Sequence, residues 1–164
     1  YGIELGTLKQ RFDRLDEGVE VIRSLLDNRV TDFEGRYFGL TGAWCEPKPV
    51  QAKLPLVIGG KGRTRTLRTA ARWADQWDMT FPATAADWLE LDGVLRAHCA
   101  DVGRDEREIT RSIHLPYPPD ASPTELAERA AAFFEAGVDL VIWSMQGPME
   151  VSRLAPLADA VCKT

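Results

Sequence analysis

Several patterns that would assign a protein to a broad class are missing from this sequence of 164 residues. It has no apolar run near the roughly 20 residues that a membrane-spanning helix needs, and no polar tract or repeat that would indicate disorder or a solenoid. It also has no excess of positive charge, because its formal net charge is −5. Binding to a polyanion requires a basic surface. We therefore expect neither a membrane span nor a nucleic-acid partner.

Cysteine is also scarce, with three residues: Cys45, Cys99 and Cys162. Their number is odd, they lie far apart, and none belongs to a CxxC or Cys/His pattern, which argues against a disulfide framework and a zinc site. We expect reduced, mostly buried thiols in a cytoplasmic protein, and no metal site. The sequence also lacks an initial Met and a signal-like basic segment followed by an apolar one, so we expect it to be a fragment.

Apolar periodicity and turn residues predict helices and strands that alternate along the chain. The first helix begins at a capping-box pattern, Thr7 and Gln10. Its apolar stripe includes Leu15 and Ile22, and Glu17 is expected on its solvent side. The further expected segments are a hairpin at 33–38, strands at 56–58, 76–80, 109–115 and 138–143, helices from 64, over 84–101 and from 122, and a last helix opening at Gly147 and Pro148.

Four units of a strand followed by a helix favour a parallel sheet with right-handed crossovers. Each strand is interpreted as a continuous apolar run, as in strands covered on both faces. Four units amount to about half of a (β/α)8 barrel, which typically has about 250 residues. The sequence therefore predicts an α/β fold of TIM-barrel type, with about half of the barrel present, as a single domain over residues 1–164. A doubly wound sheet also fits, and a small, complete flavodoxin-like sheet is the runner-up.

The most informative stretch is PLVIGGKGRTRTLRTAARWADQWD at 55–78, which combines a strand, a glycine turn and a helix opening at Thr64. A helix N-terminus already carries about half a positive charge, so clustered cations are unfavourable there unless an anion lies among them. The N–H groups of a glycine turn can bind such an anion. A basic helix more often keeps its side chains in solvent, but three glycines, Gly59, Gly60 and Gly62, favour a phosphate site. The clustered cations are Lys61, Arg63, Arg65, Arg68 and Arg72.

Three segments carry a resemblance to a known family: FEGRYFGL at 33–40, CEPKPVQAKLPLVIGGKGRTRTLRTAARWADQWD at 45–78, and VGRDEREITRS at 102–112. They are similar, in the same order, to the C-terminal half of luciferase-like monooxygenases, and more narrowly to the deazaflavin (coenzyme F420) dependent oxidoreductases. The resemblance covers nearly the whole chain and implies a TIM barrel of which the second half, strands five to eight, is present. It also implies that the glycine turn holds the cofactor phosphate, through Gly59, Gly60, Lys61, Gly62, Arg63 and Thr64. Lys61 departs from the family pattern, because many members have a small residue there.

The resemblance implies an oxidoreductase that uses a deazaflavin, or alternatively FMN, for hydride transfer to or from a small organic substrate. The strands that contact the cofactor ring, and most of the substrate pocket, would come from the first half of the barrel, so we assign no catalytic residue. His114, near the end of an expected strand, is a candidate acid or base, but a lone histidine beside apolar residues is more often structural. Trp77 is a candidate ring contact, and packing is the more common role.

Two other functions remain open. The chain could be a non-catalytic half-barrel, either a truncation product or a partner subunit, or it could be a barrel that binds sugar phosphates at the same anion site. A half-barrel leaves two sheet edges and an apolar inner face uncovered. We therefore expect the isolated chain to be inactive and to self-associate, which would make it a homo-oligomer.

Overall fold

The computed structural model describes residues 1–147 and 150–162. The chain divides into two compact units, Tyr1–Leu56 and Val57–Thr164, and each has its own secondary structure. The expectation of a single domain over the whole chain stays a prediction. Among the described residues, no helix combines the length and the apolar character that crossing a bilayer requires.

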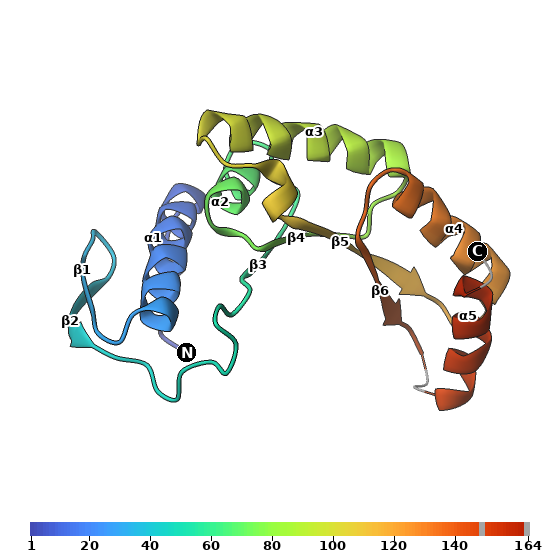
Figure 1. The fold of residues 1–164 in the computed structure, drawn as a ribbon, viewed down its shortest axis with the longest axis horizontal. Coiled ribbons are helices and arrows are strands. Elements are labelled where there is room, and N and C mark those ends of the chain that lie inside the picture. The colour runs from blue at the N-terminus through green and yellow to red at the C-terminus, as the bar shows by residue number, and fades with distance from the viewer. Residues whose placement is uncertain (148–149, 163–164) are drawn as a thin grey trace. The chain divides into compact units, whose positions relative to one another are not determined.

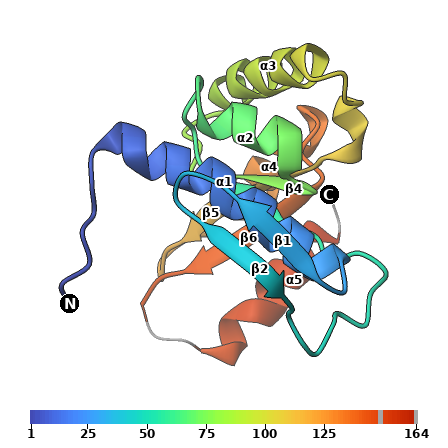
Figure 2. The same ribbon diagram turned by 90° about the vertical axis from the view of Figure 1, so that its left-hand side faces the viewer.

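The first unit consists of a helix and a two-stranded ribbon. Helix α1 spans Leu8–Asp27, and the expected capping box is confirmed: the Thr7 hydroxyl accepts the N–H of Gln10, and the Gln10 side chain accepts the N–H of Thr7. Strands β1 (Thr31–Glu34) and β2 (Gly39–Ala43) pair antiparallel, as Figure 2 shows in blue and cyan. The hairpin therefore extends on both sides of the expected segment 33–38.

The expectation that Glu17 of α1 lies on the solvent side of the helix is wrong, because its carboxylate binds backbone groups. It accepts the backbone N–H groups of Arg36 at 3.0 Å, Tyr37 at 2.8 Å and Phe38 at 3.3 Å. These donors form the turn between β1 and β2, which lies 19 to 21 residues further along the chain. The expected apolar stripe is also only partly buried, since Leu15 and Ile22 are exposed.

The second unit is built around a parallel sheet in the order β3-β4-β5-β6. This order follows the sequence without a reversal, whereas a flavodoxin-like sheet changes direction at a switch point. The runner-up topology is thus wrong, and the order is that of consecutive barrel strands (Figure 1). The elements are β3 Val57–Gly59, α2 Thr66–Trp73, β4 Gln76–Thr80, α3 Ala85–Asp101, η1 Glu106–Glu108, β5 Thr110–Tyr117, α4 Pro123–Glu135, β6 Leu140–Met145, η2 Val151–Arg153 and α5 Leu154–Val161.

Boundaries differ from the sequence prediction by one or two residues at β3, β5 and β6, and also at two helices. Helix α2 begins at Thr66 rather than Thr64, and no side chain caps its N-terminus. The last helix was expected to open at Gly147 and Pro148, and Pro148 lies outside the described residues. The described part of this helical segment begins at Val151.

The two faces of the sheet differ in character. On the helix-covered face, Trp77 of β4 stacks on Trp88 of α3 with ring centroids 6.1 Å apart, and both rings are fully buried. Successive side chains of a strand alternate between faces, so Asp78 of β4 and Ser112 of β5 lie on the opposite, inner face. These two residues are buried and polar. The expectation of strands that are apolar on both faces is therefore wrong for β4 and β5. Polar side chains are tolerated on their inner face because Ser112 and Asp78 form a hydrogen bond with one another.

Candidate functional site

The glycine turn after β3 is held against β4 by two backbone contacts. The Gly60 N–H donates to the Asp78 carbonyl at 3.0 Å, and the Gly60 carbonyl accepts the indole N–H of Trp77 at 3.0 Å. Gly60 has φ = +129°, a conformation that side chains rarely adopt. Trp77 therefore packs, as expected of it, and at the same time fixes the position of the turn.

Thr66, the first residue of α2, explains why two of the glycines are needed. A Cβ atom at Gly60 would lie 3.0 Å from Thr66 Cγ2, and one at Gly62 would lie 2.6 Å from Thr66 Oγ1. The Gly62 carbonyl also accepts the N–H of Leu67 at 3.0 Å, which draws the turn onto the helix start. Sequence reasoning missed Thr66. The available signal was a small β-branched residue four positions after Gly62.

The outer part of the turn presents backbone donors. Within the part of the chain that the structure describes, the N–H groups of Gly62, Arg63 and Thr64 have no hydrogen-bond partner, and all three residues are exposed. They directly precede α2, whose N-terminus adds a partial positive charge. Consecutive free N–H groups before a helix are the donors that phosphate oxygens need. The residues present therefore fit a phosphate group.

The charged side chains of the turn point to other partners. The Lys61 ammonium donates to the Phe81 carbonyl at 3.1 Å, just beyond the end of β4. Arg63 pairs with Glu90 of α3 at 2.8 Å, and both side chains are more than half exposed. The Arg63 carbonyl accepts the Nε2–H of His98 at 2.7 Å. An exposed pair of this kind stabilises little, so the backbone donors, rather than Arg63, are the main feature of this site.

Asp78 links the glycine turn to a polar cluster on the inner face of the sheet. Its Oδ1 accepts the Ser112 hydroxyl at 2.8 Å, and its Oδ2 accepts Nδ1–H of His114 at 2.9 Å. The Ser112 oxygen in turn accepts the side-chain amide of Gln76 at 2.8 Å. His114, weighed above as a lone histidine, therefore has a buried carboxylate partner. Sequence reasoning missed Asp78, because nothing local to β4 reveals a partner on β5.

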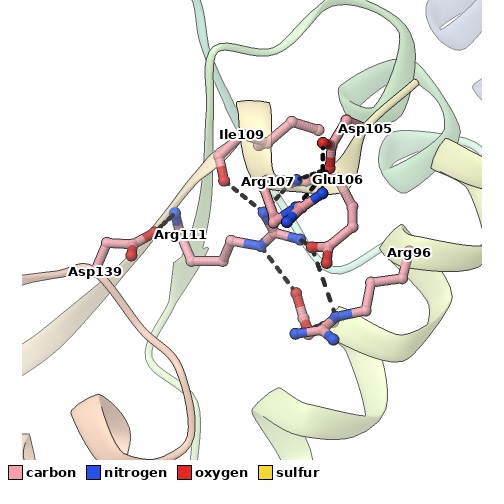
Figure 3. Close-up of polar contacts among 8 residues, drawn as sticks. Arg96, Asp105, Glu106, Arg107, Ile109, Arg111 and Asp139 are labelled. Atoms are coloured by element: carbon pink, nitrogen blue, oxygen red, sulfur yellow. Dashed lines mark hydrogen bonds and ion pairs between the residues drawn. The ribbon is translucent and has the colours of Figure 1, made fainter.

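The segment that resembles the family at 102–112 has a structural role (Figure 3). The Arg111 guanidinium, almost fully buried, donates to Asp92 of α3 at 3.0 Å and to Glu106 of η1 at 2.6 Å. Arg96 donates to the other Asp92 oxygen at 2.6 Å, and this hydrogen bond raises the pKa of Arg96. The Asp139 carboxylate accepts the backbone N–H of Arg111 at 2.7 Å.

Asp105 completes this segment at the surface. Its carboxylate accepts the backbone N–H and the guanidinium of Arg107, and these hydrogen bonds lower the pKa of Asp105. All the charges of the cluster are thus occupied by one another. The cluster ties α3, η1 and β5 together.

Comparison with known proteins gives consistent results. A sequence profile of the family described as luciferase-like monooxygenase matches residues 1–158. An F420-dependent glucose-6-phosphate dehydrogenase of Kineococcus radiotolerans is 30% identical over 160 residues, which cover 94% of this chain and 46% of that protein. The chain thus spans about half the length of such relatives.

Two solved structures share the fold. One is an F420-dependent secondary alcohol dehydrogenase in complex with an F420–acetone adduct, with a TM-score of 0.81 and 17% identity, covering 96% of this chain and 64% of that one. The other is the EDTA monooxygenase of Chelativorans sp. BNC1, with a TM-score of 0.61 and 23% identity, covering 85% of this chain and 38% of that one. The partial coverage agrees with a partial TIM barrel.

Proposed function

The chain belongs to the luciferase-like monooxygenase family, and from this premise we propose that it is the C-terminal half of an oxidoreductase that exchanges a hydride with a small organic substrate. The bound cofactor, coenzyme F420 or alternatively FMN, would supply the hydride chemistry at its ring. Relatives that are named as F420-dependent support the deazaflavin. The protein's own task is then to bind the cofactor, orient it and exclude water.

The observation that carries this proposal is the row of free N–H groups at Gly62, Arg63 and Thr64 before α2. We assign the cofactor phosphate to this row. Gly59 and Gly60 shape the turn, and the extended Lys61 side chain closes its side towards the end of β4. The fit of Thr66 against both Gly60 and Gly62 keeps the donors in place.

The chain covers about half of its relatives, so the activity is proposed for the whole protein. Strands β3 and β6 are the two edges of the described sheet. Unpaired edges attract further strands. We therefore propose that the isolated chain lacks activity and self-associates, and that the remaining strands of the barrel cover these edges in the full-length protein.

The test is a cofactor titration of the full-length protein that contains this chain, carried out with F420 and with FMN. Gly62→Ala should weaken binding by about ten-fold or more, equivalent to about 1.4 kcal/mol, because the new methyl group collides with Thr66 Oγ1. Adding Thr66→Ala should recover much of this loss. Gly93→Ala is the matched control, because a Cβ there meets nothing within 4 Å.

A deazaflavin without phosphate separates the phosphate site from the rest of the cofactor site. Gly62→Ala should leave its affinity within about two-fold of the wild-type value, a difference on the order of RT. If Gly62→Ala behaves like Gly93→Ala towards F420 and FMN, the phosphate does not bind at this turn. If the wild-type protein binds neither cofactor, the proposed function itself is wrong.

A further inference from the structure

His114 and Asp78 lie at the same edge of the sheet as the glycine turn. Both belong to the inner face: Asp78, the middle residue of β4, is level with Gly59 at the end of β3, and His114 of β5 is level with Thr80 at the end of β4. The His114 carbonyl accepts the N–H of Phe81 at 3.0 Å, and the Phe81 carbonyl accepts the ammonium of Lys61 from the turn. The Asp78 carbonyl accepts the N–H of Gly60. Two short chains of contacts thus connect the histidine to the proposed phosphate site.

Asp78 fixes which nitrogen of His114 is available. The Asp78 carboxylate is 8% exposed and bonds to Ser112, His114 and, at 3.4 Å, to the Thr80 hydroxyl. A carboxylate only accepts hydrogen bonds, so Nδ1 of His114 carries the proton and donates it. In the neutral ring, Nε2 is then an acceptor. No described residue bonds to Nε2, and the His114 side chain is 33% exposed.

In His114, one ring nitrogen is held by a buried carboxylate, and the other has no partner among the described residues. This is the arrangement by which a carboxylate orients an imidazole and fixes its tautomer. We infer that His114, positioned by Asp78, takes up and returns the proton on the oxygen of a hydroxyl or carbonyl substrate. The inference rests on the proposed oxidoreductase function.

Oxidation of an alcohol removes a hydride from its carbon and a proton from its oxygen, so the proton needs an acceptor. When an alcohol is oxidised, its carbinol C–H bond breaks and the hydride leaves with the electron pair to the oxidised deazaflavin or flavin. The O–H bond also breaks, its proton passes to Nε2 of His114, and the carbon–oxygen double bond forms. In the reverse direction the imidazolium returns the proton to the carbonyl oxygen. In this step Nε2 of His114 exchanges the proton, and Nδ1 stays bonded to one oxygen of the Asp78 carboxylate. Ser112 donates to the other oxygen of that carboxylate.

The surroundings of His114 hold few other charges. On β4 the facing groups are Asp78 and the neutral Thr80, on β5 the neutral Ser112 precedes it on the same face, and β6 places Ile142 opposite it. Asp78 is therefore the one charged group, within the described part of the sheet, that bears on the imidazole.

The first test does not depend on turnover. The full-length protein is treated with diethyl pyrocarbonate, and the ethoxyformylated histidines are identified by mass spectrometry with and without F420 or FMN. We expect His114 to react in the cofactor-free protein and to be protected by whichever cofactor binds. The bound cofactor should slow the reaction at least about five-fold. Failure of His114 to react without cofactor would show that Nε2 is covered, and would overturn the inference.

The second test is steady-state kinetics with a panel of small secondary alcohols and their ketones. His114→Gln should lower kcat by about a hundred-fold or more, the usual contribution of a positioned acid or base, with cofactor affinity within about three-fold. It should also flatten the pH profile of kcat, and imidazole should restore part of the activity of His114→Ala. Asp78→Asn should lower kcat with little change in KM. Asp159→Asn, on the exposed side of α5, is the matched control.

The outcomes separate this inference from the proposed function. Normal cofactor binding together with an unchanged kcat in His114→Gln would overturn the inference alone. Absence of cofactor binding in the wild-type protein would overturn the proposed function and this inference with it. If no alcohol or ketone of the panel is turned over, the first test decides. Reaction of His114 with diethyl pyrocarbonate, and its protection by the cofactor, would then support the inference, and absence of the reaction would overturn it.

Discussion

Asp92→Asn should destabilise the fold strongly, because it removes a buried charge from the Arg111 cluster. The side chains of Asp92 and Arg111 are 2% and 6% exposed, and they are joined at 3.0 Å. Removing one partner of a buried pair costs about 3–5 kcal/mol. Glu106 still compensates part of the Arg111 charge at 2.6 Å, so we expect the lower end, about 3 kcal/mol. This is a large part of the 5–15 kcal/mol, roughly, that stabilises a typical domain.

Urea unfolding followed by tryptophan fluorescence measures the effect, since Trp88 lies one helical turn before Asp92 and is fully buried. With a slope of about 2 kcal/mol per molar urea, the midpoint should fall by about 1.5 M. Asp101→Asn is the control on the same helix: its side chain is 78% exposed, and its effect should stay within about 0.5 kcal/mol. The double change Asp92→Leu with Arg111→Met should cost less than Asp92→Asn, because no buried charge is then left unpaired, and the more exposed Arg96 and Glu106 remain 3.8 Å apart. If Asp92→Asn also stayed within about 0.5 kcal/mol, water would have to reach the cluster, and the reasoning from burial would be wrong.

Two further predictions concern other parts of the chain. Burial raises the pKa of the Cys99 thiol, so the native protein holds this proton at a pH where the unfolded chain releases it. The free energy of unfolding should therefore keep the full contribution of this thiol below about pH 8.5, the pKa of an unfolded thiol, and should decrease above that pH. Urea unfolding from pH 7 to 10 should show a smaller decline for Cys99→Ala, and an equal decline in both proteins would contradict the assignment. Glu17→Gln should weaken the turn between β1 and β2 by about 1–3 kcal/mol, because a charged acceptor of several N–H groups is lost. Faster hydrogen exchange of Tyr37 and Phe38, compared with the exposed control Glu20→Gln, would support this, and unchanged exchange would refute it.

The sequence predicts those parts of the structure that depend on residues close together in the chain, such as helix caps, apolar runs and glycine turns. Strand β4 was predicted at its observed bounds, because a cap at Thr84 marks the helix after it and an apolar tryptophan is its second residue. The alternation of strands and helices was confirmed for the same reason. The strand, glycine turn and helix at 57–73 were also predicted from adjacent local signals, whereas the role of this turn as a phosphate site stays a prediction.

The errors concern contacts between residues that are distant in the sequence. Glu17 accepts donors from a turn about 20 residues away, and its charge alone suggested solvent. Asp78 and His114 are 36 residues apart, so neither strand reveals the pair. The three thiols were expected to be mostly buried, but Cys45 and Cys162 are exposed, because a cysteine count carries no information about position.

The fit of Thr66 between two glycines has a consequence for directed evolution of this site. A larger residue at 62 is unfavourable while Thr66 is present, and a change at 60 meets both Thr66 and the backbone constraint of φ = +129°. The order in which substitutions accumulate therefore matters, because a variant at 62 becomes acceptable only after 66 has lost its hydroxyl. Libraries that vary one position at a time would report the turn as immutable. Libraries that vary 62 and 66 together would reach turn sequences that variation at either position alone cannot reach.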